Sequence, residues 1–312
     1  MVSAIGGAKH ITVDQAGGAT NVPSMKPLEG KVAIVTGAGR GIGRAIAVGF
    51  ADSGAKLSLM ARTRKELEET ADELRKRGAS VRFMAGDVSE QKTVKKLVEG
   101  TIKQFGRIDV LVNNAGLLGP IGPLEENDAE QWERAMKVNL FGYFLCCKYV
   151  LPHMKSQKAG KIINMSGAGA PNPYPMFTAY SSSKTGVLGL TQTLSAELKG
   201  FNIQVNAIAP GITNTRMQDE IISAGAKAGE AFQRAKDTKS KGGVPPERAA
   251  DLCVFLASSE SDGITGRFFS ARWDPWQSLK EKAELQRLLS SEMFTVKRID
   301  GVFFEQKESK KQ

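Results

Sequence analysis

The chain of 312 residues is 41% hydrophobic and 24% charged, a globular composition that can bury a sizeable core. Its two histidines and three cysteines argue against a His/Cys metal centre, a Ser-His-Asp triad and a disulfide framework. The net charge of +10 is compatible with nucleic-acid binding, but the sequence contains no nucleic-acid module, so we expect no specific nucleic-acid partner. Arginines that hold a phosphorylated cofactor and the basic tail at 307–312 are simpler sources of this charge.

No run of 18 apolar residues occurs, so we expect no membrane span. The first residues lack an apolar core and a basic start, which argues against a secretory signal. We expect 1–28 to be a flexible leader and the protein to be cytoplasmic, with organelle targeting by the leader as the alternative.

Short apolar runs alternate with helical segments along the chain. Strands are expected at 31–37, 56–62, 80–88, 108–116, 160–167 and 201–210. Helices are expected at 41–54, 64–78, 94–106, 129–154, 177–198, 216–236 and 245–258. This alternation predicts an α/β fold, namely a Rossmann-type doubly wound parallel sheet with helices on both faces. We assign one domain to 29–276 and an extension to 277–312.

The loop at 36–43 joins the first strand to the first helix. Gly37, Gly41 and Gly43 would allow a tight turn and close approach of a pyrophosphate to the helix N-terminus. Many strand–helix turns also use glycine, but this one opens a βαβ series, which is the context of a dinucleotide site.

The end of the second strand indicates which dinucleotide binds. An acidic residue there would hold the ribose hydroxyl of NAD, but the chain has Ala61 followed by Arg62. Arg40 lies in the glycine loop. Two guanidiniums could clamp a 2′-phosphate, so the sequence predicts NADP(H); the alternative is that both are solvated surface charges.

Further motifs make the chain resemble the short-chain dehydrogenase/reductase family over about residues 29–270, in its single-domain oxidoreductase branch. They are the glycine loop "TGAGRGIG", Asp87–Val88, "NNAG" at 113–116, Val138–Asn139, "YSSSK" at 180–184 and "NAIAPGITNT" at 206–215.

The resemblance implies a role for each matching residue. Asp87 and Val88 would contact the adenine. The groove that binds the cofactor would be lined by Asn113, Ala115 and Gly116. Ile42 of the glycine loop would also contact the cofactor. Pro210, Gly211, Ile212 and Thr215 would hold the nicotinamide and its phosphate. The catalytic residues would be Asn139, Ser166, Tyr180 and Lys184.

Tyr180 and Lys184 lie four residues apart on one face of a helix. A free tyrosine has a pKa near ~10, and a lysine ammonium beside it would favour the phenolate. Tyr180 would exchange a proton with the substrate oxygen, Lys184 would activate it and anchor the ribose, and Asn139 would steady a relay water. Alone, the pair would more often be an ordinary half-buried tyrosine with a lysine that snorkels.

Ser166 does not match the family spacing. The substrate-polarising serine usually stands thirteen residues before the tyrosine, a position occupied here by Gly167. We expect the loop to absorb one residue so that Ser166 binds the carbonyl. The alternatives are a structural serine and an oxyanion stabilised by Tyr180 alone.

Two segments should form the substrate pocket, 213–243 and the loop with Tyr174, Met176 and Phe177. The first carries six cations, which suit an anionic substrate or a solvated helix face. Ser278 and Glu281 predict a capping box before a helix of about a dozen residues. Trp273 and Trp276 could cover the pocket or pack against a neighbouring subunit.

The sequence therefore predicts an NADP(H)-dependent reductase of ketones, or dehydrogenase of secondary alcohols, including 3-oxoacyl thioesters as substrates. Reduction of a C=C bond suits the Tyr180/Lys184 pair less well. By resemblance we expect a homodimer or homotetramer. A non-catalytic NADP-binding sensor or scaffold on the same fold is the alternative.

Overall fold

The computed structural model describes residues 26–167 and 169–296. Its strands are β1 (Val32–Thr36), β2 (Lys56–Ala61), β3 (Val81–Ala85), β4 (Val110–Asn113), β5 (Gly160–Met165), β6 (Ile203–Ala209) and β7 (Phe268–Ser270). They form one parallel sheet in the order β3-β2-β1-β4-β5-β6-β7. This confirms the predicted Rossmann-type doubly wound sheet.

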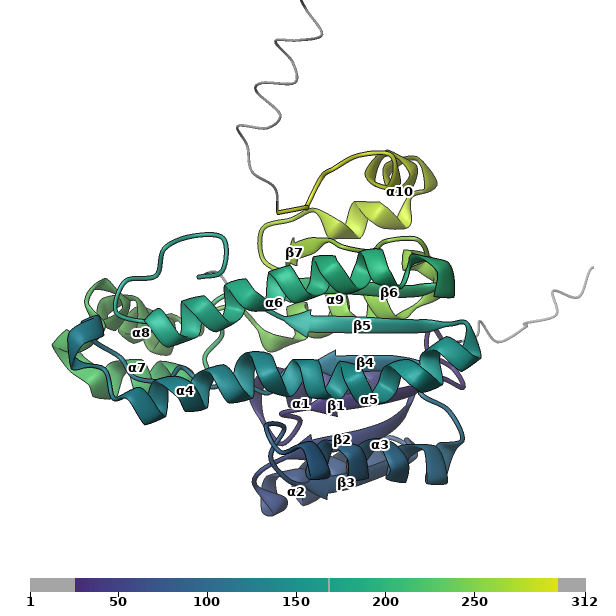
Figure 1. Ribbon diagram of the computed structural model, residues 1–312, viewed down its shortest axis with the longest axis horizontal. Coiled ribbons are helices and arrows are strands. Elements are labelled where there is room, and N and C mark those ends of the chain that lie inside the picture. Colours follow the sequence, from purple (N-terminus) through teal and green to yellow (C-terminus); the bar gives the residue numbers. More distant parts are fainter. Residues whose placement is uncertain (1–25, 168, 297–312) are drawn as a thin grey trace, which may run out of the picture.

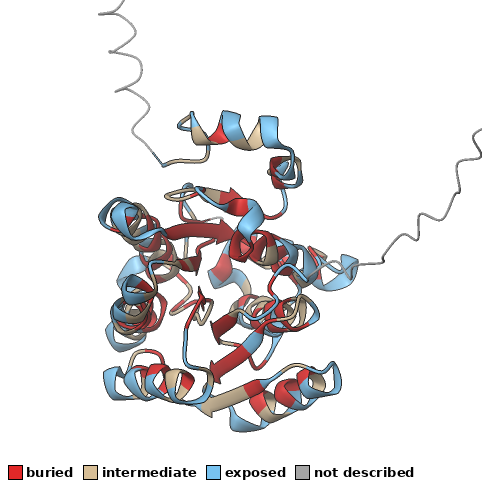
Figure 2. Ribbon diagram, turned by 90° about the vertical axis from the view of Figure 1, so that its right-hand side faces the viewer, coloured by how far each residue is buried: buried red, intermediate tan, exposed pale blue. Residues whose placement is uncertain are grey.

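Helices connect the strands and cover both faces of the sheet (Figures 1 and 2). They are α1 (Gly41–Asp52), α2 (Arg64–Lys76), α3 (Gln91–Phe105), α4 (Ala129–Met136), α5 (Gly142–Gln157), α6 (Thr178–Glu197), α7 (Arg216–Ala224), α8 (Glu230–Lys241), α9 (Pro246–Ala257) and α10 (Lys282–Leu289). Shorter turns are η1 (Leu124–Glu126), η2 (Lys137–Phe141), η3 (Lys199–Phe201), η4 (Gly225–Ala228), η5 (Ser259–Ser261) and η6 (Trp276–Lys280).

The core has one layer on each side of the sheet. On one side α1, α2 and α9 bury apolar residues such as Phe50, Leu67 and Phe255. On the other side α3 and α5 bury residues such as Leu97 and Leu145. The inner strands β1 and β6 are buried on both faces, as their continuous apolar sequences predict.

The segment after β7 packs on the same body. Trp276, Leu279 and Leu288 belong to the cluster of α1 and α9. Phe268 N–H donates to the carbonyl oxygen of Phe294 at 2.7 Å, beside the exposed edge of β7. The segment thus covers a strand edge that would otherwise be free to pair with another chain.

Two details of this segment differ from the sequence analysis. The capping box was wrong: Glu281 is itself the N-cap of the eight-residue α10, and the Ser278 hydroxyl donates to Pro275 O at 2.8 Å. Trp276 is buried against Phe255, whereas Trp273 is 74% exposed. The leader predicted at 1–28 lies outside the described residues except for 26–28, of which Leu28 is fully buried, and the basic tail lies outside them entirely. The domain boundaries stay predictions.

Within residues 26–167 and 169–296, no helix combines the length and apolarity needed to cross a bilayer. Cys146, Cys147 and Cys253 are free and buried, which agrees with the argument against a disulfide framework.

Candidate active site

The glycine loop lies at the carboxyl end of β1, where α1 begins. Gly37 has φ +67, which favours glycine. A Cβ at Gly43 would overlap the carbonyl oxygen of Gly37. The first turn of α1 can therefore pack against the loop only because residue 43 has no side chain. No side chain caps the first turn of α1, so its N–H groups can meet an anion. These features fit the pyrophosphate of a dinucleotide.

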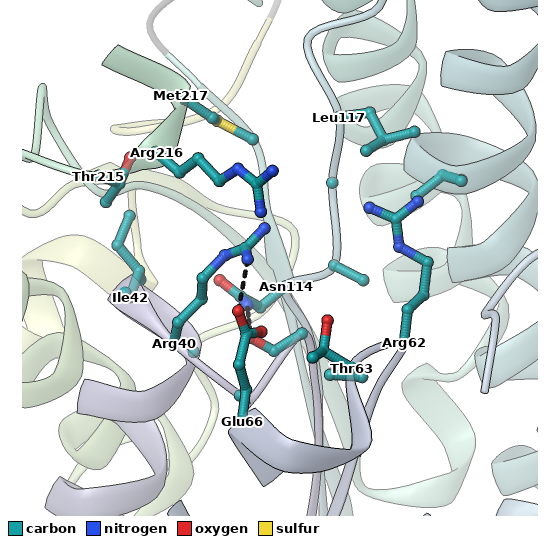
Figure 3. A pocket seen from close by; sticks show the side chains of 18 of the residues that line it. Arg40, Ile42, Arg62, Thr63, Glu66, Asn114, Leu117, Thr215, Arg216 and Met217 are labelled. Atoms are coloured by element: carbon teal, nitrogen blue, oxygen red, sulfur yellow. Dashed lines mark hydrogen bonds and ion pairs between the residues drawn. The ribbon is translucent and has the colours of Figure 1, made fainter. Parts of the chain in front are cut away.

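A cavity of about 410 Å³ opens beside this loop (Figure 3). The predicted cofactor residues that line it are Gly37, Arg40, Gly41, Ile42, Gly43, Arg62, Asp87, Val88, Ala115, Gly116 and Thr215. They come from the ends of β1, β2, β3 and β4 and from the loop after β6. The structure therefore brings most of the predicted cofactor residues to one cleft at the carboxyl edge of the sheet, as expected for a doubly wound fold.

Some predicted cofactor residues lie outside this lining. Asn113 is fully buried, and its amide donates to the side-chain oxygen of Asn164 at 2.9 Å. Its neighbour Asn114 lines the cavity and donates to the carbonyl oxygen of Thr36 at 2.9 Å. Sequence reasoning missed Asn114, although the β4 pattern contained the signal, because successive strand residues point to opposite faces. Pro210, Gly211 and Ile212 follow β6 but are not among the lining residues.

Asp87 is held by two neighbours at the cavity wall. Ser89 donates to it from N–H at 2.9 Å and from the hydroxyl at 2.7 Å, and Arg134 of α4 forms an ion pair with it. Partial burial alone would raise the pKa of Asp87, but the bonds from Ser89 and Arg134 outweigh it and lower that pKa. A fixed, ionised carboxylate is therefore available to accept hydrogen bonds from an adenine.

Arg40 and Arg62 both line the cavity but differ in their surroundings (Figure 3). The Arg40 guanidinium forms an ion pair with the Glu66 carboxylate at 2.7 Å. Glu66 stands in the first turn of α2 and also lines the cavity. Arg62 lies on the other side of the cleft, and Arg216 reaches in near Arg40. The sequence analysis did not identify Glu66 or the position of Arg216.

Lys184 lies fully buried behind the cofactor cavity. Its Nζ donates to Met165 O at 2.7 Å and to the Tyr143 hydroxyl at 3.2 Å. It also lies 5.8 Å from the ring centre of Tyr180. A Cβ at Gly116, which lines the cavity, would lie 3.6 Å from this Nζ. The lysine thus lies close to both the candidate catalytic tyrosine and the cofactor groove.

Burial dominates the protonation of both residues. It raises the pKa of Tyr180 to about 12 and lowers the pKa of Lys184 to about 7. The sequence predicted that the lysine charge would favour the phenolate, but in this structure the pKa of Tyr180 is raised first by burial and then by the charge of Tyr174. Tyr180 therefore carries its proton at neutral pH.

Asn139 lies in η2, a π-helical turn between α4 and α5. Its side-chain oxygen accepts from Leu117 N–H at 2.8 Å, and its amide donates to Leu117 O at 2.8 Å and to the Ser183 hydroxyl at 2.9 Å. Ser183 belongs to α6, so Asn139 ties the cavity loop to the helix that carries Tyr180. π turns often occur at functional sites.

Ser166 and Gly167 follow β5 directly. The buried Ser166 hydroxyl donates to the carbonyl oxygen of Lys184 at 3.1 Å. A Cβ at Gly167 would lie 2.7 Å from the Tyr180 hydroxyl. The residue beside the tyrosine hydroxyl is therefore Gly167. Binding of a substrate oxygen by Ser166 stays a prediction, and it would require the hydroxyl to leave Lys184.

Tyr180 packs against an apolar cluster. This apolar wall combines residues of the two segments predicted to form the substrate pocket: Tyr174, Met176 and Phe177 from the loop, and Met217, Ile221 and Ile222 from 213–243. Tyr174 stacks on Phe177 with ring centres 4.3 Å apart. Met176 has φ +71, a strained conformation for a side-chain-bearing residue.

The basic segment 213–243 forms α7, η4 and α8 beside this wall. Four of its cations already have carboxylate partners: Lys227 with Glu126, Arg234 with Glu230, Lys239 with Asp219 and Lys241 with Asp237. These pairs favour the solvated helix face over a site for an anionic substrate.

Comparisons with known proteins agree with this site. The model of the short chain dehydrogenase family matches residues 31–225. An uncharacterized oxidoreductase of Thermotoga maritima is 40% identical over 239 residues, which are 76% of this chain and 94% of that protein. A 3-oxoacyl-acyl-carrier-protein reductase of the same organism is 35% identical over 246 residues, 77% of this chain and 95% of that protein.

Solved structures show the same architecture. NAD⁺-bound xylitol dehydrogenase superposes with a TM-score of 0.74 at 28% identity, covering 78% of this chain and 98% of that one. Carveol dehydrogenase from Mycobacterium avium, in complex with NAD, gives 0.72 at 27% identity, covering 78% and 97%. The chain is therefore an oxidoreductase that belongs to the short chain dehydrogenase family.

Proposed function

We propose that the protein transfers a hydride between NADP(H) and a ketone or secondary alcohol, with Tyr180 as the general acid and base. The observation that carries this proposal is that Lys184 lies close both to Tyr180 and to Gly116 in the wall of the cofactor cavity. The bound nicotinamide would supply or accept the hydride. The protein would position the carbonyl and move one proton.

In the reducing direction Tyr180 would donate its hydroxyl proton to the developing alkoxide. Its pKa of about 12 keeps that proton in place at neutral pH. General acid catalysis of this kind contributes about 100- to 10,000-fold. Lys184, itself held by hydrogen bonds to Met165 O and the Tyr143 hydroxyl, would keep a fixed position near the Tyr180 ring. Asn139 would keep the Leu117 loop and α6 together and steady the proton relay.

For Ser166, the contact with the Lys184 carbonyl supports the structural alternative. We propose that Tyr180 alone is the side-chain donor to the substrate oxygen. Ser166→Ala should then lower the melting temperature and change kcat little. If the variant instead turned over roughly a hundredfold more slowly at unchanged stability, the substrate-binding role would be supported.

The preference for NADP(H) is supported by Arg40 and Arg62 in the cavity and by Ala61 where an acid would favour NAD. The apolar wall and the paired cations of α7 and α8 support an uncharged, largely apolar group on the substrate. The 3-oxoacyl reductase relative makes a 3-oxoacyl thioester one candidate of this kind.

Purified protein titrated with NADPH and NADH, then assayed by loss of nicotinamide absorbance across apolar ketones and 3-oxoacyl thioesters, tests the proposal. We expect turnover with NADPH on at least one of these substrates, and we expect the Tyr180→Phe variant to lose that turnover. Unchanged turnover in that variant would reject the catalytic role, and a preference for NADH would reject the cofactor assignment.

The family resemblance further suggests a homodimer or homotetramer. Sedimentation velocity at micromolar concentration would give the mass, and a 33.6 kDa species alone would contradict this assignment.

A further inference from the structure

Glu66 introduces a negative charge into the place where the proposed function requires a 2′-phosphate. Its carboxylate lines the cofactor cavity and forms a 2.7 Å ion pair with Arg40, one of the two arginines expected to bind that phosphate (Figure 3). The side chain of Glu66 is 29% exposed and that of Arg40 is 43% exposed. This acid comes from α2 rather than from the end of β2, where an NAD-selecting acid usually stands.

The position of Glu66 is fixed by contacts on both sides. A Cβ at Gly39 would lie 2.9 Å from the Cβ of Glu66 and 3.2 Å from its Oε2, so the carboxylate rests on the glycine loop. The same point lies 3.6 Å from the Cβ of Ala61, at the end of β2.

Thr70, one turn later in α2, holds the backbone in place. Its fully buried hydroxyl lies 2.9 Å from the carbonyl oxygen of Glu66 and 3.2 Å from that of Gly39. The first turn of α2 is therefore tied to the glycine loop, and the backbone of Glu66 is held beside the loop that carries Arg40.

A carboxylate at this point has opposite effects on the two nicotinamide cofactors. It can accept a hydrogen bond from a ribose hydroxyl, which NADH has at the 2′ position. It repels a phosphate dianion, and it forms an ion pair with the Arg40 guanidinium that would otherwise bind that phosphate. Arg62 has no ion pair among those described for the cavity, so it can bind phosphate without displacing a carboxylate.

We propose that Glu66 is a specificity-determining residue that competes with the 2′-phosphate for Arg40. The protein then discriminates between NADPH and NADH less strongly than two unpaired arginines would, and it can use both. This inference rests on the proposed nicotinamide-dependent function and names the residue that sets its cofactor ratio.

The test is Glu66→Gln, which removes the charge and keeps the size. The dissociation constants of NADPH and NADH are measured by fluorescence titration of the full-length variant and the wild type. The ratio of the NADH constant to the NADPH constant should rise roughly tenfold in Glu66→Gln, a typical effect of a charge pair close to a ligand. The increase should shrink at high salt, because both side chains are partly exposed.

Glu73→Gln is a matched control. Glu73 also lies on α2 and is also 29% exposed, and it pairs with Arg44 of α1 at 2.7 Å and more weakly with Arg77 at 3.4 Å. It does not line the cavity, so its removal should leave the cofactor ratio unchanged. Thermal unfolding of both variants shows whether α2 is intact.

The wild-type titration tests the proposed function separately. If the wild type prefers NADH, the NADP(H) assignment fails, yet a gain of NADPH affinity in Glu66→Gln would still support the role of Glu66. If the wild type prefers NADPH and Glu66→Gln leaves the ratio unchanged or weakens NADPH binding, the function stands. Glu66 would then serve only to orient Arg40, and the inference would be overturned.

Discussion

The Lys184 ammonium nitrogen lies 2.7 Å from the carbonyl oxygen of Met165, the last residue of β5. A second hydrogen bond joins the same nitrogen to the Tyr143 hydroxyl. These two hydrogen bonds replace the hydration that the buried ammonium group loses. They do not offset the full cost of burying a charge, and the pKa of Lys184 falls to about 7.

Stability should depend on pH through Lys184. Its pKa is lowered from 10.5 to about 7 in the folded protein, so the unfolded chain binds more protons between these values. The free energy of unfolding should therefore rise with pH in this window, and the burial penalty is complete below pH 7. The free energy of unfolding of Lys184→Met should therefore increase less between pH 7 and 9.5 than that of the wild type, by up to about 3 kcal/mol.

Urea unfolding of the wild type and Lys184→Met at both pH values measures the difference. Lys148→Met, at an exposed position of α5, is the control and should retain the wild-type slope. Parallel pH profiles for the wild type and Lys184→Met would contradict the prediction.

Tyr180→Phe should slow carbonyl reduction by about 100- to 10,000-fold, because it removes the proposed proton donor. The dissociation constant of NADPH should change little, since the ring and the Lys184 contacts remain. Tyr149→Phe is a suitable comparison, because the Tyr149 hydroxyl only accepts a hydrogen bond from the exposed Gln91. Steady-state kinetics and fluorescence titration separate the two effects, and equal losses in both tyrosine variants would argue against catalysis by Tyr180.

Gly167→Ala should displace the Tyr180 hydroxyl, because the new Cβ would lie 2.7 Å from it. We expect kcat to fall at least roughly tenfold, since a misplacement of about 1 Å can cost far more than that. Gly189→Ala, in α6 with nothing within 4 Å of its Cβ, should be active and slightly more stable. Full activity of Gly167→Ala would show that the hydroxyl can act from another position.

Gly43→Ala should abolish tight cofactor binding, because its Cβ would overlap the carbonyl oxygen of Gly37 and force α1 away from the loop. The new Cβ would also lie 2.5 Å from the side-chain nitrogen of Asn114, which could shift, but Gly37 O belongs to the backbone, so relaxation must move backbone. Gly49→Ala in the same helix meets only Ala250 at 3.4 Å and Val254 at 3.6 Å and should bind normally. Isothermal titration with NADPH compares them, and equal affinities would mean that the loop does not form the phosphate site.

The fold could be predicted from the sequence because its signals are local. The apolar run at 31–37 appears as β1, Val32–Thr36, with all five residues buried. The glycine loop is likewise found where a strand meets a helix. Such patterns depend on neighbours in the chain, and those neighbours are visible in the sequence.

The features that could not be predicted depend on contacts between distant segments. The expected helix at 129–154 is α4 and α5 separated by η2, since Asn139 is held by the Leu117 loop. The pairing of Arg40 with Glu66 joins residues 26 positions apart. The pKa of Tyr180 depends on burial beneath several elements, which no spacing between Tyr180 and Lys184 reveals.

The π turn at Lys137–Phe141 has a consequence for protein engineering. One additional residue per turn changes the phase between the helices on either side, so a single-residue deletion there would rotate α5 by about 100° relative to α4. Either Asn139 would leave the Leu117 loop or Leu145 and Cys146 would leave the core. Insertions elsewhere on the surface can be absorbed by loops, but the length of this segment is fixed by two requirements at once.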